Sequence, residues 1–379
     1  MSNLPIIHSY KDLLEFNKSL GDKKYLTYNI SGVKYAKNTI EVNGETVNID
    51  RFLYDYIVNQ SFILTGKIER LKQYDFSRLN YLLHPEFREE FVGKLRAYFN
   101  NVVMLGGSEV ELWDFTLTIE GKDIILKRYN KARAEEVFIP SFITKIEGGA
   151  FYKVTTTNET YFKYLKKVTI EEGSQLKAIG DNAFYFCTAL EEINLPEGLE
   201  SIGANAFYKC NFISVLIPSS VKVIKERAFE YCRQLRQVVF KNNSRLKVLE
   251  NNTFNGCLAL EKINLSSSLE EIGTSTFRFC RSLEKINIPD SVKILGEFVF
   301  ANCYKLKEVK IGKGVTAIPT HAFRHCDSLT KVTALGNIDI ISTDAFDIKN
   351  IPKVYIPKTS KFEPSENDEE AYRDKIIKQ

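Results

Sequence analysis

The chain has 379 residues, of which 44% are hydrophobic and 26% charged, and its formal net charge at pH 7 is +4. This hydrophobic content is enough for a continuous core, and the net charge is too small to require an anionic partner. No stretch approaches the roughly 18 uninterrupted apolar residues of a membrane-spanning helix. These values exclude a disordered chain and predict no membrane span.

The N-terminal segment Met1–His8 has neither a basic stretch nor a long apolar stretch. It therefore lacks the two features of a secretory signal peptide, and we expect a cytoplasmic protein.

Residues 1–130 predict a separate small α+β domain that acts as an N-terminal cap or as a tethering module. Helices are expected over Tyr10–Leu20, which Ser9 can cap, over Arg51–Gln60, and from Pro85 to about Asn100. Hairpins are expected over Thr39–Val47 around Asn43-Gly44, and over Glu111–Arg128 around Glu120-Gly121. The domain contains no pattern that we recognise as a family.

A repeat begins after this domain, and all seven cysteines occupy the same position in it. Each cysteine follows a phenylalanine by three residues, and these phenylalanines are 22 to 25 residues apart. A fixed period in the low twenties indicates a solenoid, in which each repeat forms one coil. The pairs are Phe184/Cys187, Phe207/Cys210, Phe229/Cys232, Phe254/Cys257, Phe277/Cys280, Phe300/Cys303 and Phe323/Cys326.

The repeat also contains an alternating apolar segment, such as Leu283-x-x-Ile286-x-Ile288, that has the period of a β-strand. Proline often follows it and ends strand pairing there, as Pro289 does. A second apolar pair comes next, for example Leu199 and Ile202. The pattern predicts ten strands, centred near residues 138, 169, 194, 216, 239, 264, 287, 310, 333 and 355.

The pattern L-x-x-I-x-x-x-A-F-x-x-C-x-x-L-x-x-I-x-I-P resembles the BspA-type (Treponema-like) leucine-rich repeat, over about residues 134–358. The resemblance implies a mainly β, right-handed solenoid with a parallel sheet of about ten strands on one face, which we place at residues 131–358. Proteins with this repeat are commonly surface or secreted adhesion and interaction proteins. The resemblance therefore leaves a location at a cell surface or on a virion open.

Two segments depart from the repeat. The spacing from Phe151 to Phe184 is ten residues longer than the period, and the polar and aromatic segment Tyr152–Tyr164 is expected to loop out. Residues 359–379 form a polar C-terminal tail, for which we expect a short helix at Glu369–Lys378 or no ordered structure.

The cysteines are interpreted as buried, reduced thiols, because an odd number with one per coil does not indicate a disulfide framework or a metal site. A strained disulfide between neighbouring coils stays open. His321 and His325, which flank Phe323, are interpreted as variable surface residues rather than as metal ligands. The sequence predicts no cofactor, no metal site and no catalytic constellation.

The strand face is the candidate binding surface, since residues between the inward apolar positions must point outward. Leu216 and Val239 form a small apolar spot beside a mostly basic region. We expect a protein partner there, with an apolar knob and an acidic flank, while a solubilising lysine surface is the competing interpretation. Nucleic acid fits poorly, because the lysines lack interleaved aromatics. The predicted contact residues are Leu216, Val239, Lys262, Asn264, Lys285, Asn287, Lys310, Lys331 and Tyr355.

The predicted function is a non-enzymatic protein-interaction scaffold. Two alternatives remain: a surface or virion adhesin, and an enzyme whose catalytic part lies in residues 1–130.

Overall fold

The structure is a computed structural model. It describes residues 115–154, 159–363, 372 and 374–379, together with strands β1 (Ile6–Ile7), β2 (Thr39–Val42), β3 (Glu45–Ile49) and β4 (Val110–Leu112). The chain divides into two compact units, Met1–Asp114 and Phe115–Gln379.

In the first unit, β1, β3 and β2 form a sheet in that order. β2 and β3 pair antiparallel with Val42 opposite Glu45, which confirms the hairpin expected around Asn43-Gly44. The three helices expected in this part of the chain lie outside the described residues.

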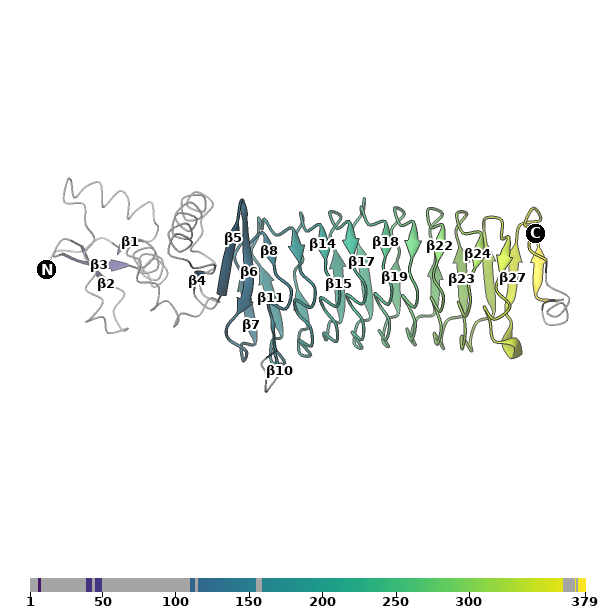
Figure 1. Cartoon of the computed structure of the whole chain (residues 1–379), viewed down its shortest axis with the longest axis horizontal. Coiled ribbons are helices and arrows are strands. Elements are labelled where there is room, and N and C mark those ends of the chain that lie inside the picture. The colour runs from purple at the N-terminus through teal and green to yellow at the C-terminus, as the bar shows by residue number, and fades with distance from the viewer. Residues whose placement is uncertain are drawn as a thin grey trace. The chain divides into compact units, whose positions relative to one another are not determined.

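The second unit is a mainly β solenoid whose coils stack side by side, as Figure 1 shows from β7 to β27. The ten expected strands are confirmed, and they run parallel on one side of the coils, which we call the strand face. They are β7 (Glu136–Ile139), β11 (Lys167–Ile170), β13 (Glu192–Ile193), β15 (Ser214–Ile217), β17 (Gln237–Phe240), β19 (Lys262–Asn264), β21 (Lys285–Asn287), β23 (Glu308–Ile311), β25 (Lys331–Ala334) and β27 (Lys353–Ile356).

Backbone hydrogen bonds divide the strand face into three ladders, with interruptions between β13 and β15 and between β19 and β21. The first interruption has a cause in the sequence. Cys210 is followed two residues later by the core residue Phe212, whereas Cys187 is followed three residues later by Leu190, so one coil is a residue short. The second interruption separates coils of equal length.

A second parallel sheet lines another side of the coils. Each strand has two residues and contains the second apolar residue of the repeat, such as Ile202 or Ile224, which points into the core. The strands are β8 (Lys145–Ile146), β12 (Ala178–Ile179), β14 (Ser201–Ile202), β16 (Val223–Ile224), β18 (Val248–Leu249), β20 (Glu271–Ile272) and β22 (Ile294–Leu295), followed by the pair β24 (Ala317–Ile318) and β26 (Ile340–Ile341).

The core is built around a column of stacked phenylalanines. Nine rings from Phe151 to Phe346 follow one another with centroid distances of 4.5 to 5.8 Å and interplanar angles of 3° to 20°. Each ring is almost fully buried. The repeated spacing of these residues therefore reflects one aromatic side chain per coil at the same place in the core.

The corner that holds each phenylalanine has an unusual backbone. In seven successive coils, from Phe184 to Phe323, the residues two before and two after the phenylalanine have positive φ; the non-glycine values run from 52° to 63°. Backbone N–H groups of each corner donate hydrogen bonds to carbonyls of the next coil. The N–H of Phe184 donates to the carbonyl of Ala206 at 2.8 Å, and that of Phe186 to the carbonyl of Tyr208 at 3.0 Å. The corner thus forms a third hydrogen-bonded column along the solenoid.

The cysteines follow the phenylalanines into the core. All seven are buried, as expected, and none forms a disulfide. From Cys210 onward, each thiol donates a hydrogen bond to the phenylalanine carbonyl of the preceding coil, at 3.1 to 3.4 Å. Burial raises the pKa of every one of these thiols above its ordinary value. The thiols therefore act as neutral, weak donors that join neighbouring coils.

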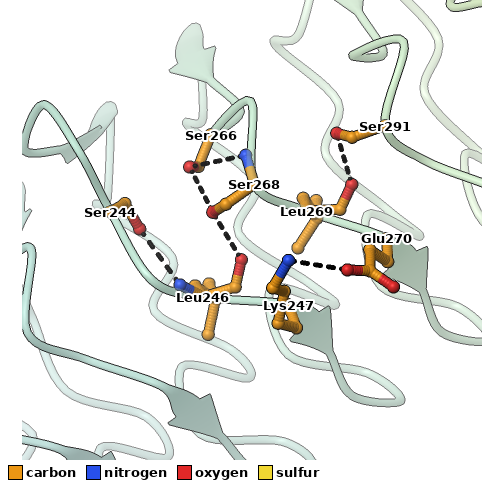
Figure 2. Close-up of polar contacts among 8 residues, drawn as sticks. All are labelled: Ser244, Leu246, Lys247, Ser266, Ser268, Leu269, Glu270 and Ser291. Carbon is orange, nitrogen blue, oxygen red and sulfur yellow. Dashed lines mark hydrogen bonds and ion pairs between the residues drawn. The ribbon is translucent and has the colours of Figure 1, made fainter.

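Polar side chains also link the coils at the surface. Ser268 and Ser291 donate from Oγ to the carbonyls of Leu246 and Leu269 in the preceding coils, at 2.8 and 2.6 Å (Figure 2). Beside them, the ammonium of Lys247 contacts the carboxylate of Glu270 at 2.6 Å (Figure 2). Because exposed ion pairs contribute little free energy, the hydroxyl bonds to backbone carbonyls are the stronger of these links.

A hairpin covers the N-terminal end of the solenoid core. β5 (Phe115–Glu120) and β6 (Asp123–Tyr129) pair antiparallel across a turn that contains Gly121, as expected, and β6 then pairs parallel with β8. The ring of Tyr129 lies 5.4 Å from that of Phe151 and 5.2 Å from that of Phe115. Tyr129 therefore continues the aromatic column into the hairpin.

Each of the two irregular segments contains strands that the sequence did not suggest. The segment expected to loop out contains an antiparallel pair, β9 (Tyr152–Val154) and β10 (Glu159–Tyr161). The expected helix at Glu369–Lys378 is wrong at its end: β28 (Ile376–Lys378) is a strand that pairs parallel with β27. β27 is the last strand of the strand face, so the backbone N–H and C=O groups on its outer edge lack a partner from another coil. A strand such as β28 can pair with these groups, whereas a helix cannot.

Candidate partner-binding face

The predicted contact residues lie where the alternation of the strands places them. Leu216 and Val239 are 48% and 37% exposed, and they are direct neighbours in the register of β15 and β17. Val239 in turn pairs with Asn264 of β19, and Asn287 of β21 pairs with Lys310 of β23. Tyr355 is only half-buried, and the other predicted residues are exposed: Lys262, Asn264, Lys285, Asn287, Lys310 and Lys331.

A crevice of about 730 Å³ opens on the strand face where the ladder between β19 and β21 is interrupted. Four of the predicted residues line it, two from each strand: Lys262, Asn264, Lys285 and Asn287. The buried residues Ile263 and Ile286 also belong to its lining. A smaller hollow of about 280 Å³ lies beside it and includes Lys310 and Lys331 in its lining.

The sequence did not predict this crevice. Periodicity places side chains on one side of a strand or the other, but it does not show whether adjacent strands share hydrogen bonds. β19 and β21 have the same sequence, Lys-Ile-Asn, and the ladder is interrupted between them.

The lysines of this face differ in their surroundings. Lys285 pairs with Glu308 at 2.8 Å, and this hydrogen bond raises the pKa of Lys285 and lowers that of Glu308. The ammonium of Lys331 lies 5.3 Å from the centre of the Tyr355 ring. Among the described residues, no carboxylate is within ion-pair distance of Lys262 or Lys310. Lys262, beside the crevice, and Lys310 therefore contribute positive charge that no ion pair with a described residue compensates.

The two histidines of the last cysteine-containing coil differ in their surroundings. His321 is half-buried, with its ring 4.6 Å from that of Phe298 and Nε2 3.4 Å from a carboxylate oxygen of Asp344. His325 is exposed, and its ligand atoms lie within 4.8 Å of those of Asp327 and Asp347.

Asp347 has a structural role in this group. Its carboxylate accepts the backbone N–H of His325 at 2.7 Å, at the position where a backbone carbonyl accepts the equivalent bond in the preceding coils. The cluster of His325, Asp327 and Asp347 is thus explained as the end of the hydrogen-bonded column at the corners. The absence of a metal site stays a prediction from the sequence.

A comparison with known protein families agrees with this architecture. The description "BspA type Leucine rich repeat region (6 copies)" matches residues 155–249 and 247–366, which is more than half of the chain. The chain belongs to the BspA-type leucine-rich-repeat family. This confirms the resemblance seen in the sequence. No curated protein matches the chain.

Several solved structures are similar to this chain. A leucine-rich repeat protein from Bacteroides ovatus is 25% identical with a TM-score of 0.42, over 67% of this chain and 76% of that chain. A leucine-rich cell surface protein from Faecalibacterium prausnitzii is 20% identical with a TM-score of 0.34, over 71% and 94%. The leucine-rich repeat protein of T. pallidum is 22% identical with a TM-score of 0.38, over 62% and 86%.

Within the part of the chain that the structure describes, no helix combines the length and apolarity needed to cross a membrane.

Proposed function

We propose that this protein is a non-enzymatic scaffold that binds a protein partner through the strand face of its solenoid. The observation that carries the proposal is the crevice between β19 and β21, which lies beside the exposed Leu216–Val239 spot. Solenoids expose extended surfaces of this kind and enclose little volume for chemistry.

The arrangement suits a partner with one anchoring side chain. Interfaces derive most of their affinity from a few anchors that fill pockets, surrounded by contacts that exclude water. The crevice offers such a pocket with Ile263 and Ile286 in its lining, while Asn264 and Asn287 can supply hydrogen bonds at its mouth. Leu216 and Val239 extend the contact across two further strands, and Lys262 and Lys310 favour an acidic flank on the partner.

Two variants of the full chain test the proposal. Leu216→Asp/Val239→Asp places charge in the apolar spot, and Lys262→Glu/Lys285→Glu/Lys310→Glu reverses the charge around the crevice. Both sets of side chains are exposed or paired at the surface, so the fold is expected to persist. We expect each variant to weaken the partner's affinity by about tenfold or more, with the lysine variant acting mainly on the association rate.

The measurement is quantitative affinity purification with the full chain, followed by binding kinetics on the partner that is enriched. Lys293→Glu/Lys313→Glu/Lys349→Glu serves as the matched control, because these lysines are also exposed but lie off the strand face. A partner that binds the wild type and both strand-face variants with equal affinity would place the binding surface elsewhere and refute the proposal.

A further inference from the structure

A second cluster of aromatic and cationic side chains lies at the corner of two successive coils, which we call the arginine corner. It consists of Arg278, Phe279 and Arg281 from one coil and Phe298 and Tyr304 from the next. The guanidinium carbon of Arg278 lies 4.9 Å from the centre of the Phe279 ring and 5.5 Å from that of Phe298. That of Arg281 lies 5.9 Å from Phe279 and 5.4 Å from Tyr304. Four ring contacts thus hold two guanidinium groups around Phe279.

The two arginines form no ion pair with any residue that the structure describes. Elsewhere on the coils, lysines pair with carboxylates of neighbouring coils, as Lys222 does with Glu200 at 2.7 Å and Lys307 with Glu284 at 3.0 Å. Among the described residues, no carboxylate is within ion-pair distance of Arg278 or Arg281. The Nε–H of Arg278 is buried and has no hydrogen-bond partner. A buried donor without a partner is unfavourable, so the stacking on Phe279 and Phe298 holds this guanidinium at some cost in free energy.

The arginine corner has the backbone conformation of the other corners. Phe279 and Phe298 have φ of 60° and 55°, a region that favours glycine and asparagine over bulky side chains. The equivalent positions in other coils also have positive φ and hold both asparagine and bulky residues, such as Asn205 and Tyr231. The backbone conformation is therefore common to the repeat, and it is the combination of rings and arginines that distinguishes this corner.

We propose that the arginine corner is a docking site for an acidic polypeptide segment of a protein partner. A guanidinium group offers planar, paired N–H donors that match a carboxylate, and stacking on a ring fixes its orientation before the ligand arrives. The half-buried rings of Phe279, Phe298 and Tyr304 add apolar surface next to these donors. A segment in which carboxylates alternate with apolar side chains is complementary to both features.

Single-stranded nucleic acid fits this site less well. Its bases bind by stacking on free ring faces. Here the rings of Phe279, Phe298 and Tyr304 already carry guanidinium groups within 6 Å of their centres. None of the five residues of the arginine corner lines the crevice, although Ser282 and Lys305 of that lining directly follow Arg281 and Tyr304 in the chain. The inference is tested by its own variants, separately from the function proposed above.

The test uses the full chain and a fluorescently labelled peptide of about twenty residues in which Glu and Asp alternate with Leu and Tyr. Binding is followed by fluorescence anisotropy. We expect Arg278→Gln/Arg281→Gln to lower the affinity by about tenfold or more, since both bidentate contacts are lost. Arg278→Lys/Arg281→Lys keeps the charge but loses the planar donors, and we expect an intermediate loss of about threefold.

Two controls separate the site from non-specific charge effects. Arg133→Gln/Arg245→Gln removes two exposed arginines elsewhere and should leave the affinity unchanged within about twofold. The strand-face variant Lys262→Glu/Lys285→Glu/Lys310→Glu should retain binding of this peptide to within about threefold, because only its long-range charge has changed. Should Arg278→Gln/Arg281→Gln melt below the assay temperature, the exposed Arg281→Gln alone replaces it.

Four outcomes would overturn the proposal. The wild type fails to bind the peptide; the glutamine variant binds it as tightly as the wild type; the strand-face variant or the distant-arginine control loses as much affinity as the glutamine variant; or a single-stranded oligonucleotide of equal charge binds more tightly than the peptide and depends on the same arginines.

Discussion

Each core phenylalanine between Phe184 and Phe323 is stacked between two others, so its neighbours cannot close around a smaller side chain without disturbing the column. Phe277 illustrates this, with ring centroids 5.8 Å from Phe254 and 5.5 Å from Phe300. We expect Phe277→Ala to lower the free energy of unfolding by about 3–5 kcal/mol, from lost burial and the cavity that remains. Phe279→Ala, two residues away on the half-buried surface, should cost about 1 kcal/mol or less. Denaturant titration of both variants compares them, and equal losses would contradict the column as the core.

Two glycines with positive φ separate backbone strain from steric clash. Gly121 has φ of 59° and open space where a Cβ would lie, whereas Gly256 has φ of 73° and the Tyr231 ring directly over it. Gly121→Ala should therefore lower the free energy of unfolding only by the cost of holding alanine at positive φ, about 1–2 kcal/mol. Gly256→Ala should cost more, because the tyrosine ring must also move. Thermal unfolding of the two variants provides the comparison, and a smaller loss for Gly256→Ala would show that this ring moves freely.

The buried thiols predict how stability responds to alkaline pH. Burial raises the pKa of all seven, so the folded protein keeps them neutral at pH values where the unfolded chain ionises them. Their contribution to stability is fully present below the unfolded pKa of about 8.5 and falls as pH rises above it, by about 1.4 kcal/mol per pH unit for each thiol. Cys257→Ala/Cys280→Ala should make the loss of unfolding free energy between about pH 9 and 10 shallower by about 2.4 kcal/mol per pH unit. An identical pH slope in this variant and the wild type would mean that the thiols ionise in the folded state.

At the scale of the elements, the sequence predicted the features that repeat and missed those that depend on neighbouring coils. The ten strands of the strand face, the position of Phe277 and the burial of Cys280 follow from periodicity, because one residue type recurs at one place in each coil. The two-residue strands of the second sheet are too short to show alternation, so Ile202 and Ile224 indicated burial but not pairing. The crevice between β19 and β21 and the pairing of β28 with β27 depend on hydrogen bonds between segments, which a pattern along one segment does not record.

The interrupted ladder at the crevice has a measurable consequence for the backbone. β17 pairs with strands on both sides, whereas β21 pairs only with β23. We expect the amides of Lys285–Asn287 to exchange hydrogen with solvent on average about tenfold faster than those of Gln237–Val239, because they open without breaking a second ladder. Native-state hydrogen exchange measures both segments in one experiment, and equal protection would show that β19 and β21 are bonded in solution.

At the scale of the whole solenoid, each coil contacts only its neighbours, so stability is close to a sum of coil terms and interface terms. The hairpin of β5 and β6 supplies the first interface, through Tyr129 against Phe151 and the pairing of β6 with β8. Tyr129→Ser should therefore weaken the first coils and leave distant coils almost unchanged. We expect hydrogen exchange in β7, β8 and β11 to accelerate by about tenfold or more, while exchange in β23 and β25 stays within about twofold of the wild type.

Tyr164→Ser is the matched control for this prediction, since it removes an exposed ring that lies near the same end of the chain but outside the aromatic column. It should leave exchange in all five strands unchanged. A uniform acceleration from β7 to β25 in Tyr129→Ser would mean that the solenoid opens as a single cooperative unit. In that case, weakening the hairpin would unfold the strand face and the arginine corner together. If instead only the first coils open, both binding sites persist.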